Sequence, residues 1–198
     1  MSDMPSLAID DVDLARSREY SLLSSLLLRS PDAELLRQLA RLEGDSSPIG
    51  AAHTALAEAA RRLDIERVER EYFNLFVGVG RGELLPYASF YLTGSLHGRP
   101  LAALRQTMQR LGIERIAGLK EPEDHAGVLC ETLAGLAGGT IAAPANTNRE
   151  FFIEHVAPWI GRLFRDLEQA KFADFYARVG VLGRTLVDIE IEALALPA

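Results

Sequence analysis

The sequence has few of the residues that mark extracellular, metal-binding or nucleic-acid-binding proteins. Its single cysteine, Cys130, cannot form an internal disulfide and offers no cysteine-based metal site. Lysine occurs only at positions 120 and 171, and 21 basic residues stand against 28 acidic ones, which gives a net charge of −7. Clustered positive charge for duplex phosphates is therefore lacking, and we do not expect nucleic acid as a partner.

Long apolar runs are also missing. No uncharged apolar run approaches the roughly 18 residues that a membrane-spanning helix needs. The N-terminal segment, residues 1–13, is acidic and lacks the basic-then-apolar order of a secretory signal. Together with the single cysteine, these absences predict a soluble protein of the cytoplasm, without stable membrane insertion.

Alternating β-branched runs hardly occur, whereas apolar residues recur at helical spacing from end to end. The pattern predicts an all-α fold, a single-domain helical bundle over residues 1–198, with a hinge near 138–148 where Gly, Pro and Asn gather. Such a hinge is compatible with a monomer or a domain-swapped dimer. Helices are expected at about 11–28, 31–44, 50–63, 65–77, 100–112, 122–136, 152–167 and 172–189, with breaks at Gly78 and Pro158 and close helix contacts at Gly180 and Gly183.

The stretch from Glu121 to His125 places acidic residues at the start of an apolar helix. Pro122 fits the first helical position, and Glu123 and Asp124 then fall in the first turn, where carboxylates favour the positive end of the helix dipole. His125 heads the apolar stripe, so its ring should face the interior or its rim. Two interpretations remain open: Asp124 is a helix cap beside a boundary histidine, or the acidic helix start recognises an arginine-bearing peptide.

Catalytic, metal and nucleotide sites are less well supported. Neighbouring residues on a helix do not face each other, so Asp124 should not orient His125 in a hydrolase, and no nucleophile motif accompanies them. No other histidine lies three or four residues from His125, as a metal site would favour. Gly78, Gly80 and Gly82 follow a helix and lack a G-K-[ST] ending, which favours a helix end and leaves only weak guanine nucleotide binding open.

Aromatic residues are concentrated in and before the segment 78–94. Such a group is usually core, but Tyr87 and Tyr91 have polar neighbours, which favours a half-exposed rim. An apolar rim of this kind commonly marks a groove for a partner helix.

Five short motifs follow one another along the chain: YFNLFVG at 72–78, PYASFYL at 86–92, EPEDHAGVL at 121–129, HVAPW at 155–159 and FYARVGVLGRTL at 175–186. Their order resembles the TorD/DmsD-like family of cytoplasmic chaperones, which bind twin-arginine signal peptides of molybdenum-cofactor oxidoreductases. The resemblance implies an all-helical protein without catalytic activity that holds its client back from export until folding and cofactor insertion are complete. A NarJ-like assembly factor for a respiratory reductase subunit is the alternative. The chain departs from the family pattern at Val79, where proline is frequent, and at Tyr87 and Tyr91, where some relatives have tryptophan.

The resemblance implies that the Asp124-His125 pair and the aromatic loop line the signal-peptide site. We expect an apolar groove to hold the peptide there and nearby carboxylates to attract its arginines. We expect exchange of Asp124 to Asn and His125 to Leu to weaken peptide binding while leaving the melting temperature nearly unchanged. The candidate residues are Tyr72, Leu75, Phe76, Pro86, Tyr87, Ser89, Tyr91, Glu121, Glu123, Asp124 and His125.

Overall fold

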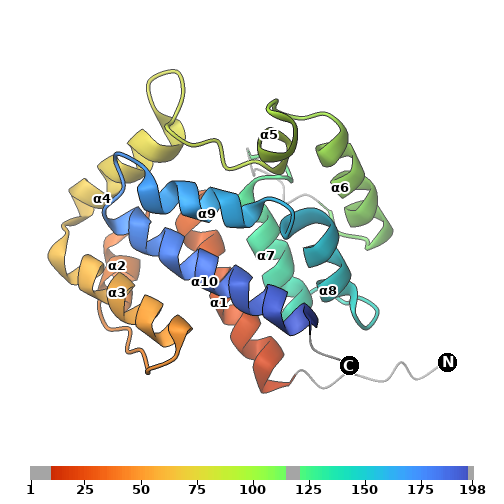
Figure 1. Cartoon of the computed structure of the whole chain (residues 1–198), viewed down its shortest axis with the longest axis horizontal. Coiled ribbons are helices and arrows are strands. Elements are labelled where there is room, and N and C mark those ends of the chain that lie inside the picture. Colours follow the sequence, from red (N-terminus) through yellow and green to blue (C-terminus); the bar gives the residue numbers. More distant parts are fainter. Residues whose placement is uncertain (1–9, 115–120, 196–198) are drawn as a thin grey trace.

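The computed structural model describes residues 10–114 and 121–195 (Figure 1). All regular structure in these ranges is helical, which confirms the predicted all-α class. Most of the acidic N-terminal segment, residues 1–9, lies outside the described residues. Within those ranges, no helix combines the length and the apolar character needed to cross a membrane. The elements are α1 (Asp11–Leu28), α2 (Ala33–Leu39), α3 (Pro48–Arg62), α4 (Ile65–Tyr72), η1 (Phe73–Val77), α5 (Ala88–Thr93), α6 (Arg99–Arg110), α7 (Ala126–Ala137), α8 (Thr147–Phe151), η2 (Phe152–Val156), α9 (Ile160–Gln169) and α10 (Phe175–Ala195).

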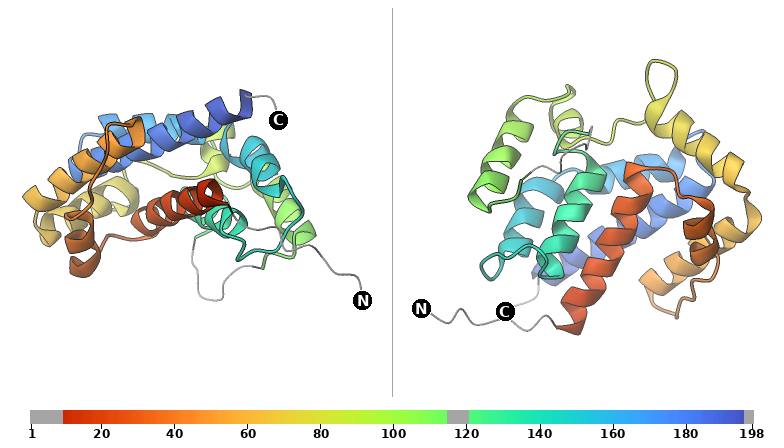
Figure 2. Two further views of the ribbon diagram at one scale, coloured as in Figure 1. Left: turned by 90° about the horizontal axis from the view of Figure 1, so that it is seen from below. Right: turned by 180° about the vertical axis from the view of Figure 1, so that it is seen from behind.

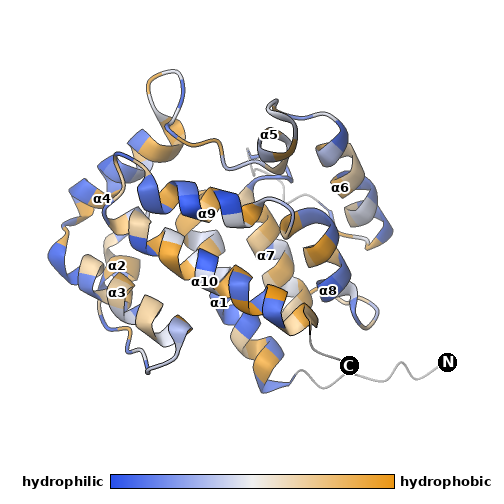
Figure 3. Cartoon of the chain, viewed as in Figure 1, coloured by the Kyte–Doolittle hydropathy of each residue, from blue (hydrophilic) through white to orange (hydrophobic). Residues whose placement is uncertain are grey.

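The helices pack around one hydrophobic core. Figure 2 shows α3, α9 and α10 in one layer, with α1 and α7 in a second layer against it. Helices α2 to α4 lie at one end of the molecule, and α5 and α6 lie at the other (Figure 1). Figure 3 shows hydrophilic residues along the visible face of α9, whereas α7 behind it is mostly apolar. Leu133 of α7, Trp159, Phe164 of α9 and Tyr176 of α10 are each at most 1% exposed.

Several predicted helix ends are confirmed. The Asp64 carboxylate accepts a hydrogen bond of 2.8 Å from the Arg67 N–H and so caps α4. Gly78, with φ 65°, ends the η1 turn, and the helix before Pro158 stops at Val156 and resumes at Ile160. The η1 and η2 turns are π-helical, which the apolar spacing did not reveal.

Two other boundaries were wrong. The cap of α2 is Asp32, whose side chain accepts from the Leu35 N–H, so the helix begins at Ala33 and the expected start at residue 31 was too early. This helix ends at Leu39 and does not reach Gly44. An aspartate one residue before the helix provides the nearest acceptor for its free N–H groups.

The predicted close helix contacts at Gly180 and Gly183 are confirmed, and the structure identifies α9 as the partner helix. A Cβ on Gly180 would come within 2.9 Å of the Phe164 carbonyl oxygen, and one on Gly183 would overlap the Phe164 ring. The predicted apolar stripe of the last helix is too long at both ends, since Phe172 is 45% and Ile189 40% exposed. Phe172 precedes α10 and is therefore not held on its buried face.

Candidate functional site

Two of the sequence motifs are joined by backbone hydrogen bonds. The Ala126 N–H donates to the Pro86 carbonyl at 2.7 Å, and the Ala88 N–H donates to the Asp124 carbonyl at 2.9 Å. The pair forms an isolated antiparallel bridge between Tyr87 and His125. The PYASFYL and EPEDHAGVL motifs, far apart in sequence, therefore form one structural unit.

Asp124 is a helix cap, but not of its own helix. Helix α7 begins at Ala126, so the prediction that Pro122 opens the helix and places Asp124 in its first turn was wrong. The Asp124 Oδ2 atom accepts a hydrogen bond of 2.9 Å from the Ser89 N–H in the first turn of α5. Asp124 is 1% exposed and Ser89 is fully buried. The Asp124 carboxylate therefore positions α5 through this buried hydrogen bond and is almost inaccessible to a ligand.

His125 caps α7. Its Nδ1 atom accepts a hydrogen bond of 3.1 Å from the Gly127 N–H, and the side chain is 3% exposed, as the predicted inward orientation requires. Burial lowers the pKa of His125 to about 4, although the carboxylates of Glu121 and Asp124 act in the opposite direction. The ring is therefore neutral near pH 7. It does not share a proton with Asp124, whose carboxylate is directed to α5, so the geometry offers no hydrolase dyad.

Tyr72, Tyr87 and Glu121 form the accessible part of this unit, which we call the tyrosine surface. The Tyr87 hydroxyl donates to Glu121 Oε2 at 2.6 Å, and the Tyr87 ring lies edge-on to His125 with centroids 5.2 Å apart. Burial, this hydrogen bond and the nearby carboxylate raise the pKa of Tyr87. Burial and the charge of Glu121 raise the pKa of Tyr72 to about 12, so both hydroxyls remain protonated donors at neutral pH.

The other predicted aromatic residues point in two directions. Phe76 packs on Tyr72 and on Tyr176 of α10, with ring centroids 5.2 and 5.4 Å apart. Tyr91 instead contacts α9: its ring lies 5.5 Å from that of Trp159, and its hydroxyl donates to Asp166. Tyr87 and Tyr91 are partly exposed, as predicted, and so are Tyr72 and Phe76, but none of the four lines the large cavity between α6 and α7.

The buried members of the predicted set support this surface from below. Leu75 is fully buried, and Pro86 is buried beside the bridge to Ala126. Ser89 uses its hydroxyl oxygen to accept from the His97 N–H at 3.0 Å. These side chains position their neighbours and have no exposed surface for a peptide to touch.

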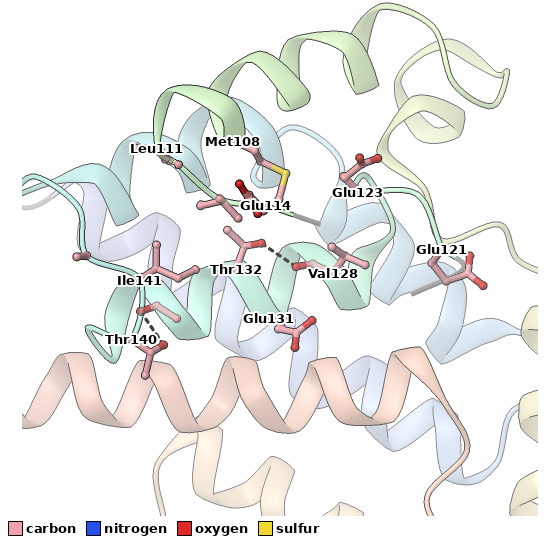
Figure 4. Close-up of a pocket in the computed structure, with 14 residues that line it drawn as sticks. Met108, Leu111, Glu114, Glu121, Glu123, Val128, Glu131, Thr132, Thr140 and Ile141 are labelled. Atoms are coloured by element: carbon pink, nitrogen blue, oxygen red, sulfur yellow. Dashed lines mark hydrogen bonds between the residues drawn. The ribbon is translucent and has the colours of Figure 1, made fainter. Parts of the chain in front are cut away.

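A large cavity lies beside this unit, between α6, α7 and residues 139–142 (Figure 4). Its volume is about 570 Å³, and its apolar wall includes Met108, Leu111, Val128 and Ile141. We call it the α6–α7 cavity. The cavity was not predicted from the sequence, because helical periodicity does not reveal where two helices diverge. The carboxylates in its lining are Glu114, Glu121, Glu123 and Glu131.

The acidic residues of the predicted site belong to both features. Glu121 accepts from Tyr87 and also lines the α6–α7 cavity. Glu123, likewise a lining residue, forms an ion pair with Arg105 of α6 at 2.8 Å. Residues 10–114 and 121–195 contain no group of three or more His, Cys, Asp or Glu side chains that could hold a metal ion.

Comparison with known proteins places the chain in a family. A model of the family described as nitrate reductase delta subunit matches residues 42–165, which is more than half of the chain. The chaperone protein TorD of Shewanella loihica is 24% identical, with 96% of this chain and 98% of the relative covered. TorD of Aliivibrio fischeri is 27% identical over 91% of this chain and 94% of the relative. A protein of Haemophilus influenzae named as the Tat proofreading chaperone DmsD is 28% identical over 65% of this chain and 61% of its own length.

A solved structure shares the fold. The crystal structure of a protein from Archaeoglobus fulgidus, described as a redox enzyme maturation protein, superposes with a TM-score of 0.58 at 23% identity, covering 86% of this chain and 93% of that chain. The relatives are named as chaperones, which confirms the prediction of a protein without enzymatic activity. The chain therefore belongs to the nitrate reductase delta subunit family, in agreement with its resemblance to the TorD/DmsD-like chaperones.

Proposed function

We propose that this protein is a cytoplasmic redox enzyme maturation chaperone, built as a single all-helical domain. It binds the twin-arginine signal peptide of a molybdenum-cofactor oxidoreductase and retains the apo catalytic subunit until folding and cofactor insertion are complete. The observation that carries this proposal is the joint between the PYASFYL and EPEDHAGVL motifs. It supports a preorganised tyrosine surface, and the family relatives include named chaperones.

The tyrosine surface suits an apolar peptide that carries positive charge. The Asp124 side chain accepts a hydrogen bond from a backbone N–H of α5, and the His125 side chain accepts one from a backbone N–H of α7. Tyr87 and Glu121, which are hydrogen-bonded to each other, are therefore held in place before a peptide arrives. Half-buried tyrosine rings offer apolar area with hydrogen-bonding hydroxyls. Glu121 supplies negative charge for an arginine.

The expected affinity is modest. Burial of about four Leu-sized side chains yields on the order of 6 to 12 kcal/mol. Ordering the peptide costs about 2 to 5 kcal/mol, and association costs at least about 4 kcal/mol more. The remainder is at most about 6 kcal/mol, which corresponds to a Kd of tens of micromolar or weaker and allows release after maturation.

Peptide binding tests the proposal directly. Fluorescence anisotropy would be measured with a labelled synthetic twin-arginine signal peptide and the wild-type chain, and with the variants Glu121→Gln and Tyr87→Phe. Both variants should weaken binding, and affinity should fall as salt rises, because partly exposed ion pairs are screened. Glu58→Gln, an exposed site on α3, makes the same change in net charge and should have no effect. Absence of binding to the wild-type chain would refute signal-peptide recognition.

The double exchange of Asp124 to Asn and His125 to Leu is not a clean test of contact. Both side chains accept hydrogen bonds from backbone N–H groups and are almost fully buried. Leucine at position 125 would leave the Gly127 N–H without its acceptor, so the structure now predicts a lower melting temperature.

The description of the matching family favours a second candidate, an assembly factor for a respiratory reductase subunit. Such a factor would bind the folded part of its client protein. Co-purification separates the two functions: a client that is lost when only its signal segment is removed supports the chaperone of signal peptides, and a client that is retained supports the assembly factor.

A further inference from the structure

The α6–α7 cavity shares Glu121 with the tyrosine surface, but its apolar wall has no part in the contacts assigned above. We propose that it is a second subsite for the same signal peptide, in which an apolar side chain enters the cavity and an adjacent arginine pairs with the carboxylates of its rim. The inference rests on the proposed function and extends its cationic recognition to a residue that the sequence motifs do not include, Glu131.

The cavity is shaped to accept side chains. Val128 and Thr132 lie on one face of α7, opposite Met108 of α6 (Figure 4), and Gly135 of the same helix also lines the cavity. Ile141 closes one side: its N–H donates to the Gly135 carbonyl at 3.0 Å, and a Cβ on Gly135 would come within 2.6 Å of Ile141 Cδ1. The absence of a side chain at Gly135 therefore leaves the space that the Ile141 side chain occupies in this wall of the cavity. A volume of about 570 Å³ lies within the usual range of ligand sites.

The charge around the cavity is negative. Four lining residues are glutamates, and none of the described lining residues is basic. Within residues 10–114 and 121–195, Arg105 pairs with Glu123 and lines an adjoining cavity of about 220 Å³. Glu131 is exposed and has no ion-pair partner within residues 10–114 and 121–195. A guanidinium can bond two carboxylate oxygens at once, so arginine suits this rim.

The combination of an apolar wall with an acidic rim selects the occupant. A phosphate or a nucleotide would be repelled by the glutamates, and a hydrated metal ion would gain nothing from Met108, Val128 and Ile141. A peptide with arginines next to apolar side chains can pair with the glutamates of the rim and pack against the apolar wall at the same time. Glu121 belongs to this cavity and to the tyrosine surface, so one extended peptide can reach both.

Two variants with matched controls test the subsite by anisotropy with the twin-arginine peptide. Ala142→Trp adds bulk at an exposed lining position, and Ala145→Trp adds it to the same segment outside the lining. Exclusion of one apolar side chain should weaken binding by about 10-fold or more for the first variant only. Glu131→Gln should weaken binding about 2- to 5-fold, and Glu58→Gln should not.

The charge assignment has its own control. A peptide with both arginines replaced by glutamine should bind wild type more weakly and should bind Glu131→Gln and wild type equally, because the interacting partner has been removed. Equal binding of both peptides to wild type would overturn the cationic part of the proposal.

Photo-crosslinking of the unaltered chain gives a result that does not depend on variant folding. A peptide with benzoylphenylalanine in its apolar segment should crosslink to Met108 or to residues 139–142, as mapped by mass spectrometry. Crosslinks confined to Tyr72 and Tyr87, with Ala142→Trp binding as wild type does, would overturn the subsite and leave the proposed function standing. If the wild-type chain binds no peptide, both fail.

Discussion

Acid should destabilise this protein through His125, the neutral imidazole that caps α7. Its pKa is about 4 in the folded state because of burial, against about 6.5 in an unfolded chain. Below pH 6.5 the unfolded chain therefore takes up a proton that the folded protein does not. The stability contribution of this residue is complete above pH 6.5 and is lost as pH falls towards 4.

The size of the effect follows from the two pKa values. A difference of about 2.5 pH units corresponds to about 3 kcal/mol once the histidine is protonated in both states, below pH 4, and to about 2 kcal/mol at pH 5. Urea unfolding followed by circular dichroism at pH 7.5 and 5.0 would measure it.

His125→Asn isolates this contribution. The Asn side-chain oxygen can accept from the Gly127 N–H as Nδ1 does, and Asn is a favourable N-cap that does not titrate in this range. Its absolute stability will be lower because the ring contact with Tyr87 is lost. The loss between pH 7.5 and 5.0 should nevertheless be smaller than in wild type by about 2 kcal/mol. An equal loss in both proteins would refute the argument and show that other groups control acid sensitivity.

Three further variants test how the site and the core are held. Asp124→Ala should lower the free energy of unfolding by about 1 to 3 kcal/mol, because the buried Ser89 N–H loses its acceptor; wild-type stability in urea would show that this cap is dispensable. Glu71→Ala should cost about 3 kcal/mol or more, since this buried carboxylate accepts from three N–H groups at the start of α10, and an unchanged melting curve would contradict that. Gly183→Ala should cost about 1 to 3 kcal/mol through overlap with a phenylalanine ring of α9, whereas Gly161→Ala, which has room, should be neutral or slightly stabilising. Equal thermal shifts for the two alanine variants would refute the packing argument.

The sequence by itself determined the features that depend on neighbouring residues. Apolar spacing of 3.6 residues predicted the all-helical class, and the expected helix start at residue 65 and the breaks at Gly78 and Pro158 are confirmed by the structure. Gly180 and Gly183 revealed the close contact of α10 before its partner helix was known. These signals are local because caps, turns and helical faces are set within a few residues.

Only the tertiary structure decided what Asp124 does and where the cavity lies. A carboxylate that precedes a helix predicts a cap of that helix, yet Asp124 binds the Ser89 N–H, 35 residues away in sequence. The α6–α7 cavity likewise depends on how Met108 and Val128 are held apart by their helices. No local pattern encodes such distances, because they result from the packing of the whole core.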